Sequence, residues 1–117
     1  MSGYESYRAG LAAEEAVAKR YAQSGAVISA RRWRGQSGEI DIVLHHQGTV
    51  VFVEVKQSRT HARAAERLSD RQMGRIYASA SEFLAGEPAG QDTDSRFDVA
   101  LVDDRGRIEV IENAFAA

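Results

Sequence analysis

The pattern of hydrophobic and polar positions divides the chain into helical and extended segments. Residues 4–24 contain no proline, are rich in alanine and glutamate, and stop before Gly25, which together predict a helix. A second helix is predicted over residues 63–84, with Ser69 as a candidate start, and it ends ahead of Pro88, the only proline of the sequence. The polar stretch that surrounds this proline is typical of a loop.

The remaining hydrophobic runs are short and β-prone, as expected for the strands of a sheet. Gly48 supplies a turn between the second and third runs, and the tetrapeptide DDRG supplies another between the last two. The predicted strands cover residues 26–34, 39–44, 50–56, 96–102 and 107–112. The order αβββαββ indicates one α/β domain over residues 1–117, in which helices flank a mixed sheet.

Two neighbouring predicted strands place charged side chains among valines and isoleucines. A turn of four residues pairs His45 with Val50, and this register sets Asp41 opposite Glu54. A shift by one residue would mix the apolar and polar faces, so the hydrophobic pattern itself favours the register. Opposed carboxylates about 5 Å apart repel by roughly 3 kcal/mol at an effective dielectric constant near 20. Lys56 shares a strand face with Glu54, and a positive charge or a proton is expected between the two acids.

Glu14 adds a third acidic group, from the first predicted helix. It lies in the middle of an apolar stripe that is expected to face the core, where a carboxylate rarely stays without a partner. The stripe consists of Tyr7, Leu11, Ala18 and Tyr21, with Val17 and Ala22 beside it. Three carboxylates and Lys56 leave about two negative charges, the amount that one divalent cation neutralises. Because the chain has no cysteine, its oxygen ligands favour Mg²⁺ or Mn²⁺ over zinc.

Composition and charge bear on where the protein is located and on how it could bind nucleic acid. The chain has 117 residues, no cysteine and a net charge of −2, and it contains neither a repeat nor a low-complexity tract. The polar N-terminal segment and the lack of a long apolar run predict neither a signal peptide nor a membrane anchor, so we expect a cytoplasmic protein without membrane contact. Any nucleic-acid binding must use a local basic patch, since the whole chain is not basic.

Two stretches offer such a patch. Arginines recur every four residues at 59, 63, 67, 71 and 75, and we expect Arg71, Gln72 and Arg75 to contact nucleic acid because the earlier part of this row is expected to be mobile. Arg34 and Trp33 form the second candidate, in which the indole would stack on an unpaired base. Both have structural alternatives: the arginines would then form a solvated helix face, and the tryptophan would pack against the core.

Several short motifs, in order along nearly the whole chain, resemble one protein family. They are GLAAE at 10–14, GEID at 38–41, VFVEVK at 51–56, RFDV at 96–99 and ENAF at 112–115. Asp, then Glu-X-Lys on the next strand, is similar to the PD-(D/E)XK nuclease superfamily, and the set as a whole resembles its UPF0102 (YraN-like) family. Two positions depart from the expected pattern, since Ile40 stands where the superfamily has a proline and Val17 where an alanine is expected.

The resemblance implies a fold, a reaction and roles for individual residues. The fold would be restriction-endonuclease-like, and the reaction would be hydrolysis of phosphodiester bonds in nucleic acid, in DNA rather than RNA and in branched or single-stranded DNA by analogy with small resolvases. Asp41 and Glu54 would hold Mg²⁺ or Mn²⁺, Lys56 would position or activate the attacking water, and Glu14 would support the site directly or through a metal-bound water. Small resolvases of this fold usually act as dimers, so a homodimer is a further expectation.

Two other interpretations stay open at the level of the sequence. Asp41, Glu54 and Lys56 could form a buried salt-bridge network with a purely structural use, although such networks are poor stabilisers. The whole domain could instead be a non-catalytic module that binds nucleic acid or protein and keeps only the nuclease fold. Asp98, within RFDV, is expected to be a structural partner of a nearby arginine and not a catalytic residue.

Overall fold

The computed structural model describes residues 3–115, apart from the side chains of residues 4–6. Its elements follow the predicted order, with one extra short helix and one 3₁₀ turn. They are α1 (Gly3–Gln23), β1 (Val27–Arg34), β2 (Glu39–His46), β3 (Thr49–Gln57), α2 (His61–Ala65), α3 (Asp70–Ala85), η1 (Gly90–Asp92), β4 (Ser95–Val102) and β5 (Ile108–Phe115). The predicted α/β class and the mixed sheet flanked by helices are therefore confirmed.

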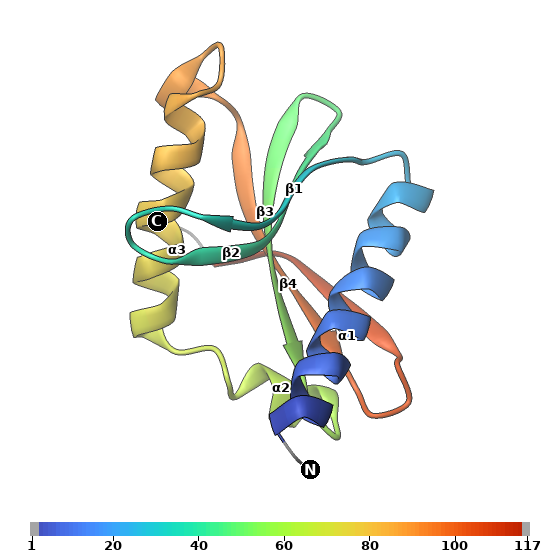
Figure 1. Cartoon of the computed structure of the whole chain (residues 1–117). Coiled ribbons are helices and arrows are strands. Elements are labelled where there is room, and N and C mark those ends of the chain that lie inside the picture. The colour runs from blue at the N-terminus through green and yellow to red at the C-terminus, as the bar shows by residue number, and fades with distance from the viewer. Residues whose placement is uncertain (1–2, 116–117) are drawn as a thin grey trace.

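The five strands form one sheet in the order β1-β2-β3-β4-β5. All neighbours are antiparallel except β3 and β4, which are parallel and are joined by the crossover through α2 and α3. Helix α1 covers one face of the sheet and α3 covers the other, as Figure 1 shows. The arrangement fits the α/β fold of nucleases broadly, with β2 and β3 inside the sheet and not at its edges.

Each helix closes its own hydrophobic cluster. On the α1 face, Val17 and Tyr21 pack against Ile42 and Val53, and on the α3 face, Ala80 and Leu84 pack against a second set of strand residues. That second set comprises Ile40, Val43, Val50 and Phe52, and all four are at most 1% exposed. The alternating side chains of β3 thus supply both cores, as the strand period of two requires.

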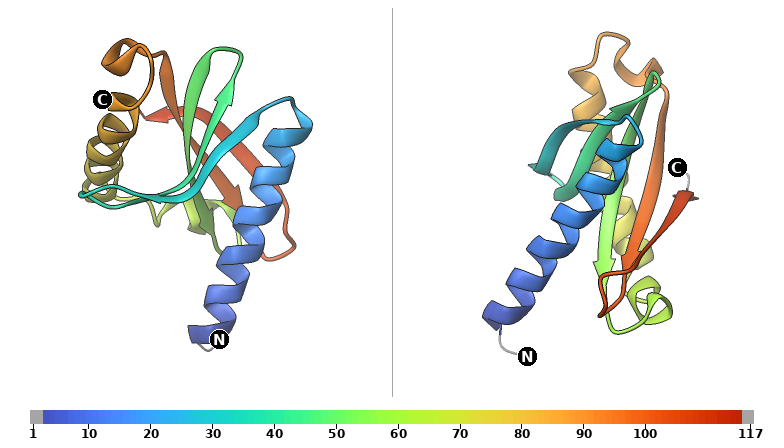
Figure 2. Two further views of the ribbon diagram at one scale, coloured as in Figure 1. Left: turned by 45° about the horizontal axis from the view of Figure 1, so that its top comes forward. Right: turned by 90° about the vertical axis from the view of Figure 1, so that its right-hand side faces the viewer.

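The predicted inward stripe of α1 is right for its second half and wrong at two positions. Val17, Ala18 and Tyr21 are buried as expected, but Tyr7 is 57% exposed and Ala22 is also exposed. The reason for Tyr7 is visible in Figure 2, where the N-terminal part of α1 extends past the sheet and leaves the first turns without a strand beneath them. The stripe therefore faces a core only from about Gly10 onwards.

The predicted helix over residues 63–84 is in fact two helices with separate caps. The Thr60 side chain accepts a hydrogen bond from the Arg63 N–H at the start of α2, and the Ser69 side chain accepts one from the Gln72 N–H at the start of α3. Such caps satisfy backbone donors that have no partner within a helix, and each fixes a helix start. The candidate start at Ser69 is confirmed, and the continuous row of arginines is interrupted there.

Asp98 ties α1, β4 and β5 together from the interior of the protein. Its carboxylate is completely buried and accepts hydrogen bonds from the Tyr21 hydroxyl (2.8 Å), the Arg96 guanidinium (3.0 Å) and the Asn113 N–H (2.9 Å). Asn113 has a positive φ of 50° at the point where the β4–β5 register shifts, so this carboxylate satisfies an N–H that the strand ladder leaves over. The expectation that Asp98 partners an arginine is confirmed.

Candidate active site on the β2–β3 hairpin

The candidate site lies where β2 and β3 stop pairing. The register pairs His45 with Val50, as predicted, and the regular ladder runs as far as Ile42 and Val53. Asp41 and Glu54 come next on the two strands and would be the following pair. The hydrophobic pattern therefore located two acids correctly at one end of a hairpin.

Beyond this ladder the two carboxylates take the places of backbone partners. The Asp41 N–H donates to Glu54 Oε1 at 3.4 Å, and the Val55 N–H donates to Asp41 Oδ2 at 2.8 Å. Glu54 is 3% exposed, whereas Asp41 is half-buried and lines a cavity. The backbone of each strand thus holds the acid of the other.

The two carboxyl groups disturb each other's ionisation. Burial raises the pKa of Glu54, the neighbouring Asp41 carboxylate raises that pKa further, and Lys56 only partly offsets this rise. Burial likewise raises the pKa of Asp41, against the lowering effect of the Val55 N–H, and the Glu14 carboxylate adds to the rise. Without a cation, the pair therefore keeps a proton at a pH at which isolated carboxyls would both be charged.

Two polar side chains from different elements hold Glu54. Lys56 Nζ is 3.8 Å from Glu54 Oε2, and its side chain is 15% exposed. The Gln72 side-chain amide of α3 donates to the same oxygen at 3.3 Å. Gln72 is in the first turn of α3, and its predicted contact with nucleic acid stays a prediction.

Glu14 reaches the same region from α1 but is engaged by an arginine. Its Oε1 and Oε2 accept hydrogen bonds from the Nε (3.2 Å) and Nη2 (3.1 Å) of Arg32. Arg32 belongs to β1 and has a positive φ of 53°, and its guanidinium lies 5.6 Å from the centre of the Tyr7 ring. Glu14 is buried and lines the cavity as expected. Because Arg32 binds both of its oxygens, Glu14 would have to release Arg32 in order to bind a metal ion or a metal-bound water.

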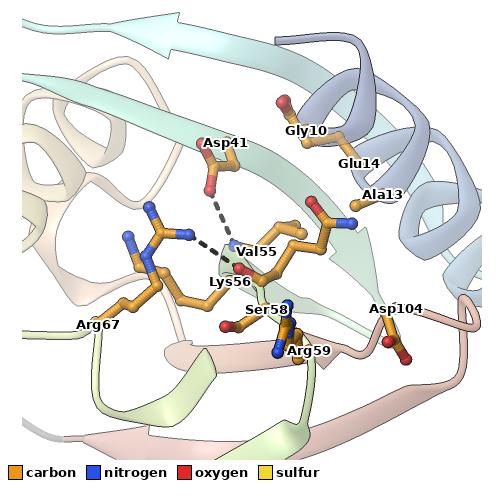
Figure 3. Close-up of a pocket in the computed structure, with 11 residues that line it drawn as sticks. Gly10, Ala13, Glu14, Asp41, Val55, Lys56, Ser58, Arg59, Arg67 and Asp104 are labelled. Atoms are coloured by element: carbon orange, nitrogen blue, oxygen red, sulfur yellow. Dashed lines mark hydrogen bonds between the residues drawn. The ribbon is translucent and has the colours of Figure 1, made fainter. Parts of the chain in front are cut away.

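A cavity of about 460 Å³ opens over Asp41 and Lys56. Figure 3 shows it between α1, which contributes Gly10, and the segment after β3, which contributes Arg59 and Arg67. The Arg67 Nη1 donates to the Gln57 carbonyl oxygen at 2.8 Å. These two arginines belong to the row of arginines in the sequence. Their position at the cavity was not predicted from that spacing, because they lie on either side of the short helix α2 and not on one helix face.

The other predicted nucleic-acid contacts lie outside this cavity. Arg71 and Arg75 are exposed on α3, and Arg34 is exposed on β1, where it is 3.5 Å from Glu39. Trp33 is half-buried and packs edge-to-face on Phe83, with ring centroids 5.5 Å apart. This contact agrees with the structural alternative for Trp33, in which the indole packs against the core. A nucleic-acid role for these residues stays a prediction.

The donor set of the hairpin suits a hard divalent cation that also keeps water or substrate oxygens. Among residues 3–115, no group of three or more histidine, aspartate or glutamate side chains is placed to hold a metal ion. Mg²⁺ is commonly bound by one or two carboxylates, with waters and phosphate oxygens completing its octahedron. Asp41 and Glu54 match that pattern, because a doubly charged ion beside them would relieve the repulsion that raises their pKa values.

Fold and site together define a small α/β domain with an Asp, Glu-X-Lys hairpin at the mouth of a cavity that both acidic and basic side chains line. The sequence profile described as "Uncharacterised protein family UPF0102" matches residues 13–102, and the chain belongs to that family. A UPF0102 protein of Cereibacter sphaeroides (strain ATCC 17029) is 66% identical over 117 residues, which is the full length of both chains.

More distant relatives carry the same family name. A UPF0102 protein of Ruegeria pomeroyi is 57% identical over 97% of this chain and 92% of its own. One from Dinoroseobacter shibae is 40% identical over 95% of this chain and 83% of its own. These names state a family and no activity. None of the helices that the structure describes is long and apolar enough to cross a membrane.

Proposed function

We propose that the protein is a divalent-metal-dependent nuclease that hydrolyses phosphodiester bonds in DNA, with branched or single-stranded DNA as its expected substrate. The observation that carries the proposal is that Asp41 and Glu54 lie next to each other. Burial and mutual repulsion raise the pKa values of both carboxyl groups, and a bound cation would relieve that repulsion. Lys56 and two arginines line the cavity beside three acids, and a divalent cation on the acid pair would make this lining net positive, which suits a phosphate group. The choice of DNA rests on the family resemblance.

The roles follow from the contacts of each residue. Asp41 and Glu54 would hold Mg²⁺ or Mn²⁺, and such an ion supplies an acidified water and a polarised phosphate when it is bound. The Val55 N–H fixes Asp41 through Oδ2, and the Gln72 amide fixes Glu54 through Oε2. Lys56 Nζ stands beside Glu54 at the cavity, where it would stabilise negative charge on the scissile phosphate and orient the attacking water.

Cation binding is the first test, because it separates this proposal from a non-catalytic module. Calorimetric titration of the wild-type protein with Mn²⁺ should give one saturable binding event that releases a proton at neutral pH, since the raised pKa values of the acid pair keep a proton that the ion displaces. Asp41→Asn and Glu54→Gln should each abolish it. Saturable binding of equal strength in both variants would refute the metal site.

Cleavage is the second test. Labelled branched, single-stranded and duplex DNA should be incubated with Mg²⁺ or Mn²⁺ and wild-type protein, Asp41→Asn or Lys56→Met. We expect products only from the wild-type protein, and only in the presence of the metal. Identical traces for wild type and Asp41→Asn would refute catalysis. If the wild-type protein gave no products, and DNA binding survived Lys56→Met but was lost in Arg71→Ala and Arg75→Ala, the binding-module interpretation would replace the nuclease.

A further inference from the structure

The cavity above the acid pair has two walls of different chemistry. One wall is α1, which presents Gly10, Ala13 and Glu14, and the other is the chain after β3, which presents Arg59 and Arg67, with Asp104 also in the lining. In Figure 3 the α1 residues and Arg67 lie on opposite sides, with Asp41 in between. A ligand in this cavity therefore meets two small residues and the Arg32-paired Glu14 on one side, and guanidinium groups on the other.

Gly10 has no explanation within the fold. It lies inside the long helix α1, where glycine costs about 0.5–1 kcal/mol relative to alanine. A Cβ atom built on Gly10 would meet nothing within 4 Å, and the residue does not have a positive φ. Packing and backbone conformation would both accept a larger residue. The remaining use of a glycine at a cavity wall is to let a ligand approach the helix backbone closely.

Arg67 is positioned for an anion. Its Nη1 is fixed by the Gln57 carbonyl oxygen at 2.8 Å, which orients the guanidinium without neutralising it. Neither Arg67 nor the neighbouring Arg59 forms an ion pair with a carboxylate in the part of the chain that the structure describes. A planar guanidinium with free N–H groups is the side chain best suited to bind a phosphate in a defined orientation.

Tyr7 extends the α1 wall by one turn. It precedes Gly10 by three positions and Glu14 by seven, so the three share one face of the helix. Its ring is 57% exposed, and the Arg32 guanidinium lies 5.6 Å from the ring centre. An exposed aromatic ring on one side of a groove and guanidinium groups on the other form a combination with which proteins bind unpaired nucleic acid, since each nucleotide presents a phosphate and a stackable base.

We propose that the cavity binds one unpaired nucleic-acid strand, whose backbone passes over Gly10, whose phosphate next to the reacting one is bound by Arg67, and whose base stacks on Tyr7. The inference rests on the proposed function for the identity of the reacting phosphate. A paired strand would not meet these walls in the same way, because its bases face the complementary strand and are not free to stack on the protein.

Glycine variants test whether the strand passes over Gly10, and the quantity measured is DNA binding and not cleavage. Fluorescence anisotropy with a labelled single-stranded DNA oligonucleotide, in EDTA, should show that Gly10→Leu weakens binding by about tenfold or more, by filling the cavity. Gly74→Leu is the matched control, because Gly74 is inside α3, is exposed and would likewise have nothing within 4 Å of an added Cβ atom. Unchanged binding by a folded Gly10→Leu protein would overturn the proposal.

The arginine and the tyrosine are tested in the same assay. Arg67→Ala should weaken binding and lower the slope of log K against log salt by about one, as expected for the loss of one phosphate contact. Arg63→Ala is its control, because Arg63 is exposed on α2 and does not line the cavity. Tyr7→Ala should weaken binding of the single strand by about fivefold or more, in line with the loss of one stacked base.

Two outcomes separate this inference from the proposed function. Cleavage of DNA by the wild type together with normal binding in Gly10→Leu and Arg67→Ala would sink the strand path and leave the nuclease standing. Loss of binding in those variants without any cleavage by the wild type would keep the path and sink catalysis. A blunt duplex of the same sequence that bound as tightly as the single strand would refute the preference for an unpaired strand.

Discussion

Two buried acidic sites on the same sheet are satisfied in opposite ways. Asp98 has three donors, from Tyr21, Arg96 and the Asn113 N–H, so its charge is fully compensated within the protein. Glu54 is almost as buried, but its nearest charged neighbours are one lysine and a second acid, Asp41. Burial of a carboxylate therefore does not by itself mark a functional site. The mark is burial that the protein's own donors leave uncompensated.

The largest expected difference is in the effect of removing each acid. Asp98→Ala should lower the free energy of unfolding by about 3–4 kcal/mol, because it leaves the Arg96 guanidinium, the Tyr21 hydroxyl and a backbone N–H without their acceptor. Urea unfolding followed by circular dichroism measures this change, with Asp92→Ala on the exposed η1 turn as the control. A loss below about 1 kcal/mol would show that Asp98 is not the structural centre described above.

Glu54→Gln should act in the opposite direction. In the metal-free protein at pH 8 we expect the variant to be more stable than wild type by about 2 kcal/mol, because a neutral amide removes the repulsion with Asp41. The raised pKa fixes the sign: the wild type binds more protons folded than unfolded above about pH 4.3, the ordinary glutamate pKa, so its stability falls as the pH rises through the folded pKa.

The difference between Glu54→Gln and wild type should therefore shrink towards pH 5. Urea unfolding of both proteins at several pH values in EDTA measures it. Equal stability of the two proteins at every pH would mean that Glu54 carries no strained charge and would remove the contrast with Asp98. Saturating Mn²⁺ should restore the advantage to the wild type, since only the wild type keeps both ligands.

The smallest expected effect is at the hydroxyl that contacts Asp98. Burial and the Asp98 carboxylate raise the pKa of Tyr21, so its hydroxyl remains a donor throughout the range in which the protein is folded. Tyr21→Phe should cost about 1 kcal/mol and leave Mn²⁺ binding unchanged, because two other donors still hold Asp98. Tyr77→Phe is the control, since the Tyr77 ring packs against Phe97 and Phe115 and would keep those contacts. A loss of Mn²⁺ binding in Tyr21→Phe would show that the two acidic sites are linked.

Much of the hairpin was predictable because it depends on local pattern. Alternation of apolar residues indicated the His45–Val50 register and placed Asp41 beside Glu54, and the Ser69 cap was recognisable from residue type alone. The partner of Glu14 was not predictable. Arg32, which pairs with it, has a left-handed backbone conformation, and nothing in an arginine-rich strand signals a positive φ.

The arginines show the same limit at longer range. A repeat of four residues suggests one helix face, but α2 ends at Ala65 and α3 begins at Asp70, so Arg67 lies between them and turns to the Gln57 carbonyl. Arg67 lies at the cavity because the connection from β3 to the parallel strand β4 passes there. The course of that connection depends on the whole sheet. Spacing along the chain carries no information about it.

The irregular outer strands have a consequence for self-association. β1 changes register between Ile28 and Ala30, and β5 does so opposite the step from Phe97 to Val99. Such breaks, together with left-handed residues at Arg32 and Asn113, prevent the long straight edge that strands of separate molecules need in order to add to one another. The irregular outer strands therefore disfavour edge-to-edge pairing between separate molecules.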